Sequence, residues 1–169
     1  MKVVLTGPES VGKSVLTKQL AYIYDGVYTE EFARKYIEKL DVPYGYQDVV
    51  NITKQQLKEY DEMQKYDGFC FFDTYLVISK IWFLHVFHKL PEWFEGEFAQ
   101  RPVDLYLLCK DDIDWKPDLV RENKAIRSLL FEKYKQQLDD YGFAYKIIEG
   151  SGEQRLLKAV DAIDEKLKK

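Results

Sequence analysis

The sequence predicts an α/β protein in which helices cover both faces of a parallel sheet. Short apolar runs alternate with longer segments of helical periodicity along the whole chain. Two of these runs, Phe69–Asp73 and Val103–Cys109, are nearly continuous in apolar residues, which is typical of strands buried on both faces. Helix-length segments between strands imply right-handed crossovers and parallel pairing. Because such sheets bind ligands beyond the carboxyl ends of their strands, we expect the functional site at that edge.

The individual elements follow from local composition and spacing. Val- and Leu-rich or aromatic runs, two of them opened by a glycine, predict five strands: Lys2–Thr6, Gly26–Thr29, Phe69–Asp73, Val103–Cys109 and Ala144–Ile148. Apolar residues at helical spacing predict helices over about Lys13–Tyr24, Glu31–Leu40, Tyr46–Tyr66, Tyr75–His88, Pro91–Ala99, from the end of the loop Asp111–Asn123 to Tyr141, and Glu153–Leu167. Since no repeat, linker or low-complexity segment interrupts them, we expect a single domain over residues 1–169.

Charge and composition limit the partners of the protein. Of the 169 residues, 46% are hydrophobic and 32% are charged, as in ordinary globular proteins. The 25 Lys and Arg residues and the 29 Asp and Glu residues give a net charge of −4. This balance argues against a protein that wraps nucleic acid or coats an anionic membrane, because both need a positive field. An anionic ligand must therefore be bound by a few well-aimed donors.

Cellular location is predicted from the cysteines and from the absence of a targeting signal. Cys70 and Cys109 lie in apolar runs, and we expect two buried thiols in a reducing compartment. No cationic leader with a cleavage site precedes the first strand. The longest apolar stretch, Tyr75–Val86, is interrupted by Lys80 and is too short to span a bilayer. A cytoplasmic protein without membrane contact is expected, and the sequence gives no indication of its oligomeric state.

The strongest motif is a phosphate-binding loop directly after the first strand. The segment Gly7–Ser14, GPESVGKS, matches G-x-x-x-x-G-K-[ST] and ends by opening a helix. Its glycines permit close approach of the backbone, so that successive N–H groups and the helix N-terminus can surround an anion. Lys13 is expected to reach the outer phosphates and the Ser14 hydroxyl to bind Mg²⁺. The predicted ATP-binding residues are Gly7, Pro8, Glu9, Ser10, Val11, Gly12, Lys13, Ser14 and Val15.

Carboxylates that end neighbouring strands are candidates for the metal and for the acceptor. Asp73 ends the third strand, where it can support Mg²⁺ beside Ser14, although an Asp at this place can also cap the next helix. Glu31 and Arg34 follow the second strand and share one helical face. They can orient an acceptor hydroxyl and neutralise phosphoryl charge, or form only a surface ion pair. We interpret them as functional because of their position at the ligand edge.

The loop Lys110–Asn123 is the other candidate segment. It is polar, follows the fourth strand and carries Trp115 and Arg121, and Arg127 lies one turn into the next helix. A lid with arginines over a triphosphate would neutralise charge and exclude water. The alternative is an ordinary acidic surface loop. Beside a phosphate-binding loop, we favour Arg121 as a lid cation.

Aromatic residues and histidines give weaker signals. A tyrosine-rich aromatic group could stack on a planar base, but its helical spacing is more often that of core residues: Tyr44, Tyr46, Tyr75, Trp82, Phe83 and Trp93. His85 and His88 lie three residues apart without an evident third ligand, which favours a surface pair over a zinc site.

Together these motifs resemble the nicotinamide riboside kinase domain of NadR-type proteins, a P-loop NTPase of the AAA_28-like ATPase family. The resemblance rests on Thr6–Ser14, Glu31–Arg34, Phe72–Thr74 and Asp114–Trp115 with Arg121, and it extends in order and spacing over essentially the whole chain. It implies a three-layer P-loop kinase fold with strand order 2-3-1-4-5. It also implies transfer of the γ-phosphate of ATP to the ribose 5′-hydroxyl of nicotinamide riboside.

The resemblance further implies site residues, and the chain departs from the family at two of these places. Glu31 and Arg34 would line the acceptor side, Ser14 and Asp73 would hold the metal, and Arg121 would belong to the lid. The family usually has Asp-Thr-Asp after the third strand, and here Tyr75 replaces the second carboxylate at a position that bears on the acceptor or the metal. The family lid commonly has Asp-Gly-x-Arg, whereas this chain has Asp118-Leu119-Val120-Arg121.

The sequence therefore predicts an ATP- and Mg²⁺-dependent kinase for a small nucleoside-like acceptor, nicotinamide riboside first. The expected catalytic residues are Lys13, Glu31, Asp73 and Arg121, and the expected substrate-binding residues are Glu31, Arg34 and Tyr75. The alternative is a regulatory P-loop ATPase without a small-molecule acceptor. A GTPase is not expected, because Asn123-Lys124-Ala125-Ile126 lacks the aspartate of the Asn-Lys-x-Asp motif.

Overall fold

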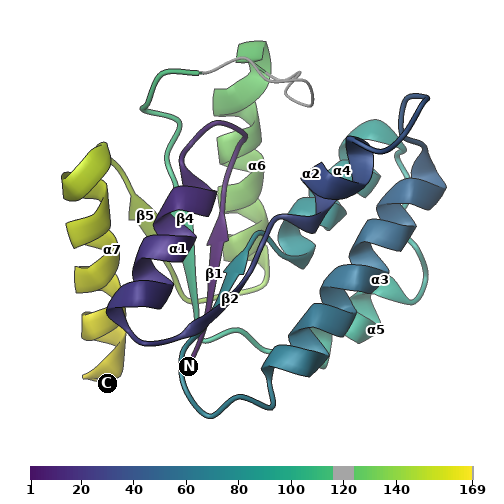
Figure 1. The fold of residues 1–169 in the computed structure, drawn as a ribbon. Coiled ribbons are helices and arrows are strands. Elements are labelled where there is room, and N and C mark those ends of the chain that lie inside the picture. Colours follow the sequence, from purple (N-terminus) through teal and green to yellow (C-terminus); the bar gives the residue numbers. More distant parts are fainter. Residues whose placement is uncertain (116–123, 169) are drawn as a thin grey trace.

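A parallel sheet of five strands in the order β2-β3-β1-β4-β5 forms the middle layer of the structure (Figure 1). The computed structural model describes residues 1–115 and 124–168. The strands are β1 (Lys2–Thr6), β2 (Val27–Thr29), β3 (Cys70–Asp73), β4 (Leu105–Cys109) and β5 (Tyr145–Ile148). The helices are α1 (Lys13–Ile23), α2 (Phe32–Ile37), α3 (Tyr46–Met63), α4 (Leu76–Val86), α5 (Phe94–Ala99), η1 (Lys124–Ile126, a 3₁₀ turn), α6 (Arg127–Asp140) and α7 (Gly152–Leu167). The predicted fold class and strand order are confirmed.

Helices on the two faces of the sheet bury alternate residues of the central strands β1, β3 and β4. On one face, Val3 and Leu5 of β1 pack with Leu16 and Leu20 of α1 and with α7. On the other face, Val4 belongs to a larger core built by α3, α4, α5 and α6. Figure 1 shows α1 and α7 on one side of the sheet and α3 and α4 on the other. The central strands are therefore buried on both faces, as their apolar runs predict.

Register brings the carboxyl ends of β1, β3 and β4 to one edge. Leu5 of β1 pairs with Asp73 of β3 on one side and with Leu107 of β4 on the other. The loops that follow these three strands therefore leave the sheet side by side. This edge contains the phosphate-binding loop, Asp73 and the segment after Cys109.

Some helix boundaries differ from the predicted ones for local reasons. Helix α2 ends at Ile37, and the chain closes with i→i+3 bonds from Lys39 to Tyr36 and from Leu40 to Ile37. Pro43 follows soon after and disfavours helical geometry at Val42. Helix α4 begins at Leu76 rather than at Tyr75, because Thr74 has a positive φ of 70° and Tyr75 is extended.

Other expectations are resolved by burial and contacts. Cys70 and Cys109 are buried free thiols, as predicted. Nδ1 of His85 lies 2.9 Å from Nζ of Lys133. Within residues 1–115 and 124–168, no cluster of three or more His, Cys, Asp or Glu side chains could hold a metal. No helix in the same ranges combines the length and the apolar character needed to cross a membrane.

A close backbone approach at Gly26 gives a test of the packing. A Cβ there would lie 2.6 Å from the carbonyl oxygen of Phe69, whereas a Cβ at Gly96 in α5 would meet no atom within 4 Å. We expect Gly26→Ala to lower the free energy of unfolding by about 1–3 kcal/mol, because β2 and β3 must separate. Gly96→Ala, the matched control, should change it by less than about 1 kcal/mol and in the stabilising direction. Urea unfolding of both variants measures the difference, and equal effects would contradict this account.

Candidate functional site

The phosphate-binding loop, residues 7–14, joins β1 to α1 in a conformation that its glycines make possible. Gly7 has a φ of 127°, and a Cβ at this position would lie 2.6 Å from the carbonyl oxygen of Cys109. Only glycine fits between β1 and the end of β4. Ser10 and Gly12 also have positive φ values, 57° and 79°, and Gly12 is the N-cap of α1. The loop thus surrounds the N-terminus of α1, where anions are favoured.

Lys13 is folded back over this loop. Its side chain is buried, with the residue 6% exposed. Its ammonium group donates hydrogen bonds to the carbonyl oxygens of Gly7, at 3.0 Å, and Pro8, at 2.6 Å. The positive charge is therefore held at the loop by charge-assisted bonds. An anionic ligand in the loop would meet this ammonium without a large movement of the backbone.

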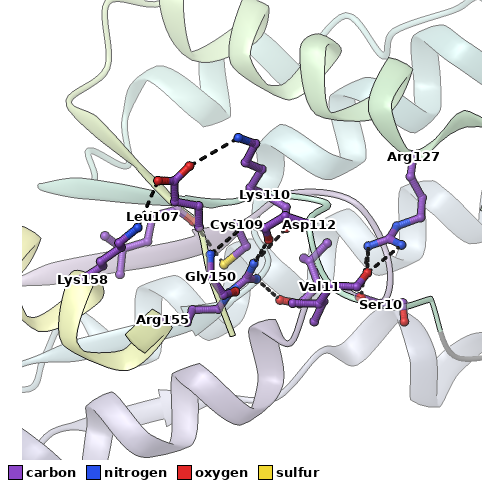
Figure 2. A network of polar contacts seen from close by, with 12 residues as sticks. Ser10, Val11, Leu107, Cys109, Lys110, Asp112, Arg127, Gly150, Arg155 and Lys158 are labelled. Atoms are coloured by element: carbon purple, nitrogen blue, oxygen red, sulfur yellow. Dashed lines mark hydrogen bonds and ion pairs between the residues drawn. The ribbon is translucent and has the colours of Figure 1, made fainter. Parts of the chain in front are cut away.

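Two arginines also bond the loop, and Figure 2 shows them reaching Ser10 and Val11 from different sides. Arg127 of α6 donates to the carbonyl oxygen of Ser10 at 3.4 Å, and Arg155 of α7 donates to that of Val11. In addition, the indole nitrogen of Trp115 donates to the carboxylate of Glu9 at 3.1 Å. Three consecutive loop residues are thus each bonded to a side chain from a segment later in the sequence.

Asp73 lies beside Ser14 at the edge of the sheet. The residue is 3% exposed, and burial together with the negative charge of Glu31 raises the pKa of Asp73 to about 6. The Ser14 side chain and the ammonium groups of Lys13 and Lys18 oppose this rise. The Oδ1 atom of Asp73 is buried without a hydrogen-bond partner among the described residues. A buried carboxylate oxygen with unused acceptor capacity, next to a hydroxyl, fits a site for Mg²⁺ or for its bound water.

The backbone directly after Asp73 is strained. Thr74 is buried and has a φ of 70°, which β-branched residues rarely adopt. Its N–H donates to the carbonyl oxygen of Leu5 at 3.0 Å, so β1 holds it in place. Such strain is often found at functional sites, where it fixes the direction of a neighbouring side chain. Here the neighbour is Asp73.

A cavity of about 420 Å³ opens from the phosphate-binding loop toward the larger core. Residues 8–15 form one end, and Glu31 and Arg34 of the segment after β2 lie beside them. Oε2 of Glu31 is 3.7 Å from Nε of Arg34, and both side chains are partly buried. The predicted ion pair therefore exists, and it faces the cavity.

The remote end of the cavity is mainly apolar. Aromatic and aliphatic side chains from α2, α3, α4, α6 and the segment between α2 and α3 line it: Ile37, Tyr44, Val49, Ile52, Ile78, Trp82, Leu130 and Tyr134. Two buried polar side chains, those of Ser79 and Gln56, interrupt this apolar surface. The Ser79 hydroxyl donates a hydrogen bond to the side-chain oxygen of Gln56 at 2.8 Å. The volume and the lining suit a planar organic group with a few polar substituents.

Sequence reasoning missed several of these lining residues. Gln56 lies in α3 on the stripe that also buries Ile52 and Tyr60, and a glutamine within an apolar stripe was the available signal. The sequence gives no such signal for Tyr134, because a tyrosine at helical spacing in α6 is as consistent with a core residue as with a residue that lines a cavity. Of the aromatic group, Tyr44 and Trp82 line the cavity.

One predicted site residue, Tyr75, lies away from the cavity. The Tyr75 ring is 1% exposed, does not line the cavity, and stacks on Tyr60 with ring centroids 5.4 Å apart. Because Thr74 turns the backbone, the Tyr75 side chain enters the core on the α3 side, next to Phe72. Arg121 lies outside the described residues.

A second cavity, of about 350 Å³, lies along the opposite side of the phosphate-binding loop. Ser10, Gly12 and Val15 line both cavities. The remaining walls come from α1, from the segment after β4 and from the start of α7: Leu16, Gln19, Ile113, Asp114, Ser151, Gly152 and Arg155. The loop thus separates two spaces, each large enough for part of a ligand.

Comparison with solved structures shows which proteins share this fold. A NadR protein in complex with NR superposes with a TM-score of 0.83 at 23% sequence identity, over 96% of this chain and 50% of that one. A NadR protein in complex with NAD and AMP-PNP gives 0.79 at 21% identity, over 99% and 49%. Deoxyadenosine kinase from M. mycoides gives 0.70 at 10% identity, over 98% and 100%. The chain spans about half the length of the NadR chains, and it has the fold of P-loop kinases.

The family is established by a match over most of the sequence. The profile of an AAA domain family, AAA_28, matches residues 2–155, which include the phosphate-binding loop, Asp73 and Arg155. The chain therefore belongs to the AAA_28 family of AAA domains.

Proposed function

We propose that the protein transfers the γ-phosphate of ATP to a hydroxyl group of a small nucleoside-like acceptor. The observation that carries this proposal is the continuity between the phosphate-binding loop and the 420 Å³ cavity. A phosphate in the loop and a ring at the remote end of this cavity would belong to two molecules that meet near Glu31. A regulatory ATPase has no need of a second, largely apolar compartment beside its phosphates.

The loop would bind the donor. ATP phosphates would occupy the N-terminus of α1, and Lys13 would exchange its carbonyl partners at Gly7 and Pro8 for phosphate oxygens. The second cavity would receive the base and ribose of ATP. A NadR protein with the same fold is described in complex with NAD and AMP-PNP, which supports a nucleotide as a ligand of this chain.

Ser14 and Asp73 would hold Mg²⁺. When bound, the metal would neutralise charge on the phosphates of the nucleotide. The unpartnered Oδ1 of Asp73 and its position beside Ser14 support this assignment. The strained backbone at Thr74 would keep the carboxylate aimed at that place.

Glu31 and Arg34 would act on the acceptor side. The Glu31 carboxylate can accept a hydrogen bond from the acceptor hydroxyl and orient it toward the phosphoryl group. The Arg34 guanidinium, with its Nε 3.7 Å from Oε2 of Glu31, adds positive charge beside the reacting groups. Asp73 is the alternative group for orienting the hydroxyl. Arg121 keeps its proposed role as a lid cation.

Nicotinamide riboside is the first acceptor to test. Its planar cationic ring suits a cavity that Trp82, Tyr44 and Tyr134 line, because aromatic faces attract cations. The NadR structure described in complex with NR supports this choice. Tyr75 lies in the core, so any polar contact to the ribose would have to come from other residues.

A panel of ribosides tests the proposal directly. ADP release from MgATP is measured without an acceptor and with nicotinamide riboside, adenosine, cytidine, uridine or ribose. We expect release to depend on the riboside and to be largest for nicotinamide riboside, because substrates held in line react fastest. Hydrolysis at the same rate with every compound would instead identify a regulatory ATPase.

Loss of the loop ammonium tests the mechanism. We expect Lys13→Ala to lower phosphoryl transfer by about 100-fold or more, because the developing charge loses its nearest cation. Lys58→Ala is the matched control, since Lys58 is exposed on α3 and pairs only with Glu62 among the described residues. Steady-state kinetics measures the activity and circular dichroism monitors the fold. A folded Lys13→Ala protein with full activity would refute the mechanism.

Protonation of Asp73 gives a pH dependence. The pKa of Asp73 is about 6, so its carboxylate becomes available for Mg²⁺ as the pH rises through that value. We expect the Mg²⁺ concentration for half-maximal ATP binding to fall over this range in the wild type. The titration of ATP itself also changes this concentration, but equally for the wild type and for Asp73→Asn. The ratio of the half-maximal Mg²⁺ concentrations of the two proteins therefore isolates the contribution of Asp73.

Asp73→Asn should also change stability: we expect it to weaken Mg²⁺ binding but to stabilise the folded protein. The folded state holds the Asp73 proton more tightly than the unfolded state, so ionisation destabilises the fold as the pH rises from about 3.8 to about 6. Asp73→Asn removes this loss and should raise the free energy of unfolding at pH 7 by roughly 1–3 kcal/mol. Chemical denaturation measures the change, and a less stable variant would contradict it.

A further inference from the structure

We propose that Arg155 is a positioning residue for polyphosphate binding, which acts through the peptide bond between Val11 and Gly12. The inference rests on the proposed function in one respect, namely that residues 7–14 bind the phosphates of a nucleotide. The inference adds Arg155, at the start of α7 and far from residues 7–14 in sequence, to the residues that determine how these phosphates are bound.

Arg155 joins three loops at the ligand edge of the sheet (Figure 2). Its residue is 4% exposed. Nε donates to the carbonyl oxygen of Gly150 at 2.6 Å, and Nη2 donates to that of Lys110 at 3.1 Å. Nη1 donates to the carbonyl oxygen of Val11. One planar guanidinium thus fixes the loops after β1, β4 and β5 relative to one another.

The bond to Val11 reaches the phosphate side of the loop through one rigid unit. The carbonyl of Val11 and the N–H of Gly12 belong to the same planar peptide and point in opposite directions. A donor that holds the carbonyl behind the loop therefore fixes the direction of the Gly12 N–H at the N-terminus of α1. It also polarises that N–H, because hydrogen bonds in a chain strengthen one another.

Asp112 completes the arrangement. Its Oδ1 pairs with Nη2 of Arg155, and its Oδ2 accepts a bond from the N–H of Gly150 at 2.7 Å. The charge of the guanidinium is thereby balanced, and its orientation is fixed. Arg127 has the same relation to the preceding peptide. Its Nη2 donates to the carbonyl oxygen of Ser10 at 3.4 Å, and this carbonyl belongs to the same peptide as the N–H of Val11.

A purely structural role explains the arrangement less well. Buried ion pairs contribute little net stability, because desolvation of the charges offsets their attraction. An apolar side chain at the first turn of α7 would avoid that cost, and it would lie one turn from Ala159, which belongs to the buried core. The guanidinium nevertheless occupies this place, and it donates hydrogen bonds to the backbone carbonyl oxygens of Val11, Lys110 and Gly150.

Calorimetric titration with two ligands tests the proposal. Mg-tripolyphosphate has no base and no ribose, whereas MgATP has both. We expect Arg155→Met to weaken both by the same factor, about tenfold, because the defect lies in the N–H groups that bind phosphate. Arg155→Lys keeps the charge but not the planar fork, so it should recover only part of the affinity. Titrations at temperatures well below the unfolding midpoint of each variant exclude loss of folded protein as the cause.

Lys158→Ala is the matched control, because Lys158 lies on the same helix and pairs with Glu149 at the surface. It should bind both ligands as the wild type does. A folded Arg155 variant with unchanged tripolyphosphate affinity would overturn the proposal, and so would a loss confined to ATP, which would indicate contact with the base. If neither Arg155 variant folds, the residue is structural and the proposal also fails. A wild type that binds neither ligand would refute the proposed function itself.

Discussion

The conformation of the main chain between β1 and α1 is the constraint on which the site depends. Gly7 must pass the carbonyl oxygen of Cys109, and Ser10 and Gly12 have positive φ values. The carbonyl oxygens of such a buried loop need hydrogen-bond donors of their own. Lys13, Arg127 and Arg155 supply them, so one set of cations stabilises the conformation that attracts anions. Both cavities and the position of Asp73 are arranged around this loop.

Most of the fold could be predicted because its signals are local and agree with one another. Nearly apolar strands such as Phe69–Asp73, separated by amphipathic helices, permit only a covered parallel sheet. The order of the strands needed the resemblance to a family, since pairing between β1 and β4 depends on contacts about 100 residues apart in sequence. Helix ends at Leu40 and Tyr75 were misplaced where a proline or a strained residue overrides the apolar spacing.

The candidate site divides in the same way. The ends of β1, β2 and β3 and the segments that follow them carry Lys13, Ser14, Glu31, Arg34 and Asp73, and the topology brings these ends to one edge. Their proximity could therefore be predicted from the sequence, whereas their roles stay a prediction. The wall of the 420 Å³ cavity comes largely from middle turns of α3, α4 and α6, where Gln56, Trp82 and Tyr134 follow the same spacing as core residues. Tyr75 shows the reverse error. Its place in the motif indicated a ligand contact, but the φ of 70° at Thr74 directs its ring into the core beside Tyr60.

The two bonds from Lys13 to Gly7 and Pro8 have a consequence for selectivity. They act as an intramolecular competitor that any incoming anion must displace. Singly charged or small anions exchange one charge-assisted bond for another and gain little. A polyphosphate would engage the ammonium and several N–H groups at once, so that its gain would exceed the cost of displacement. The two bonds would thereby favour ligands with several phosphates over simple anions.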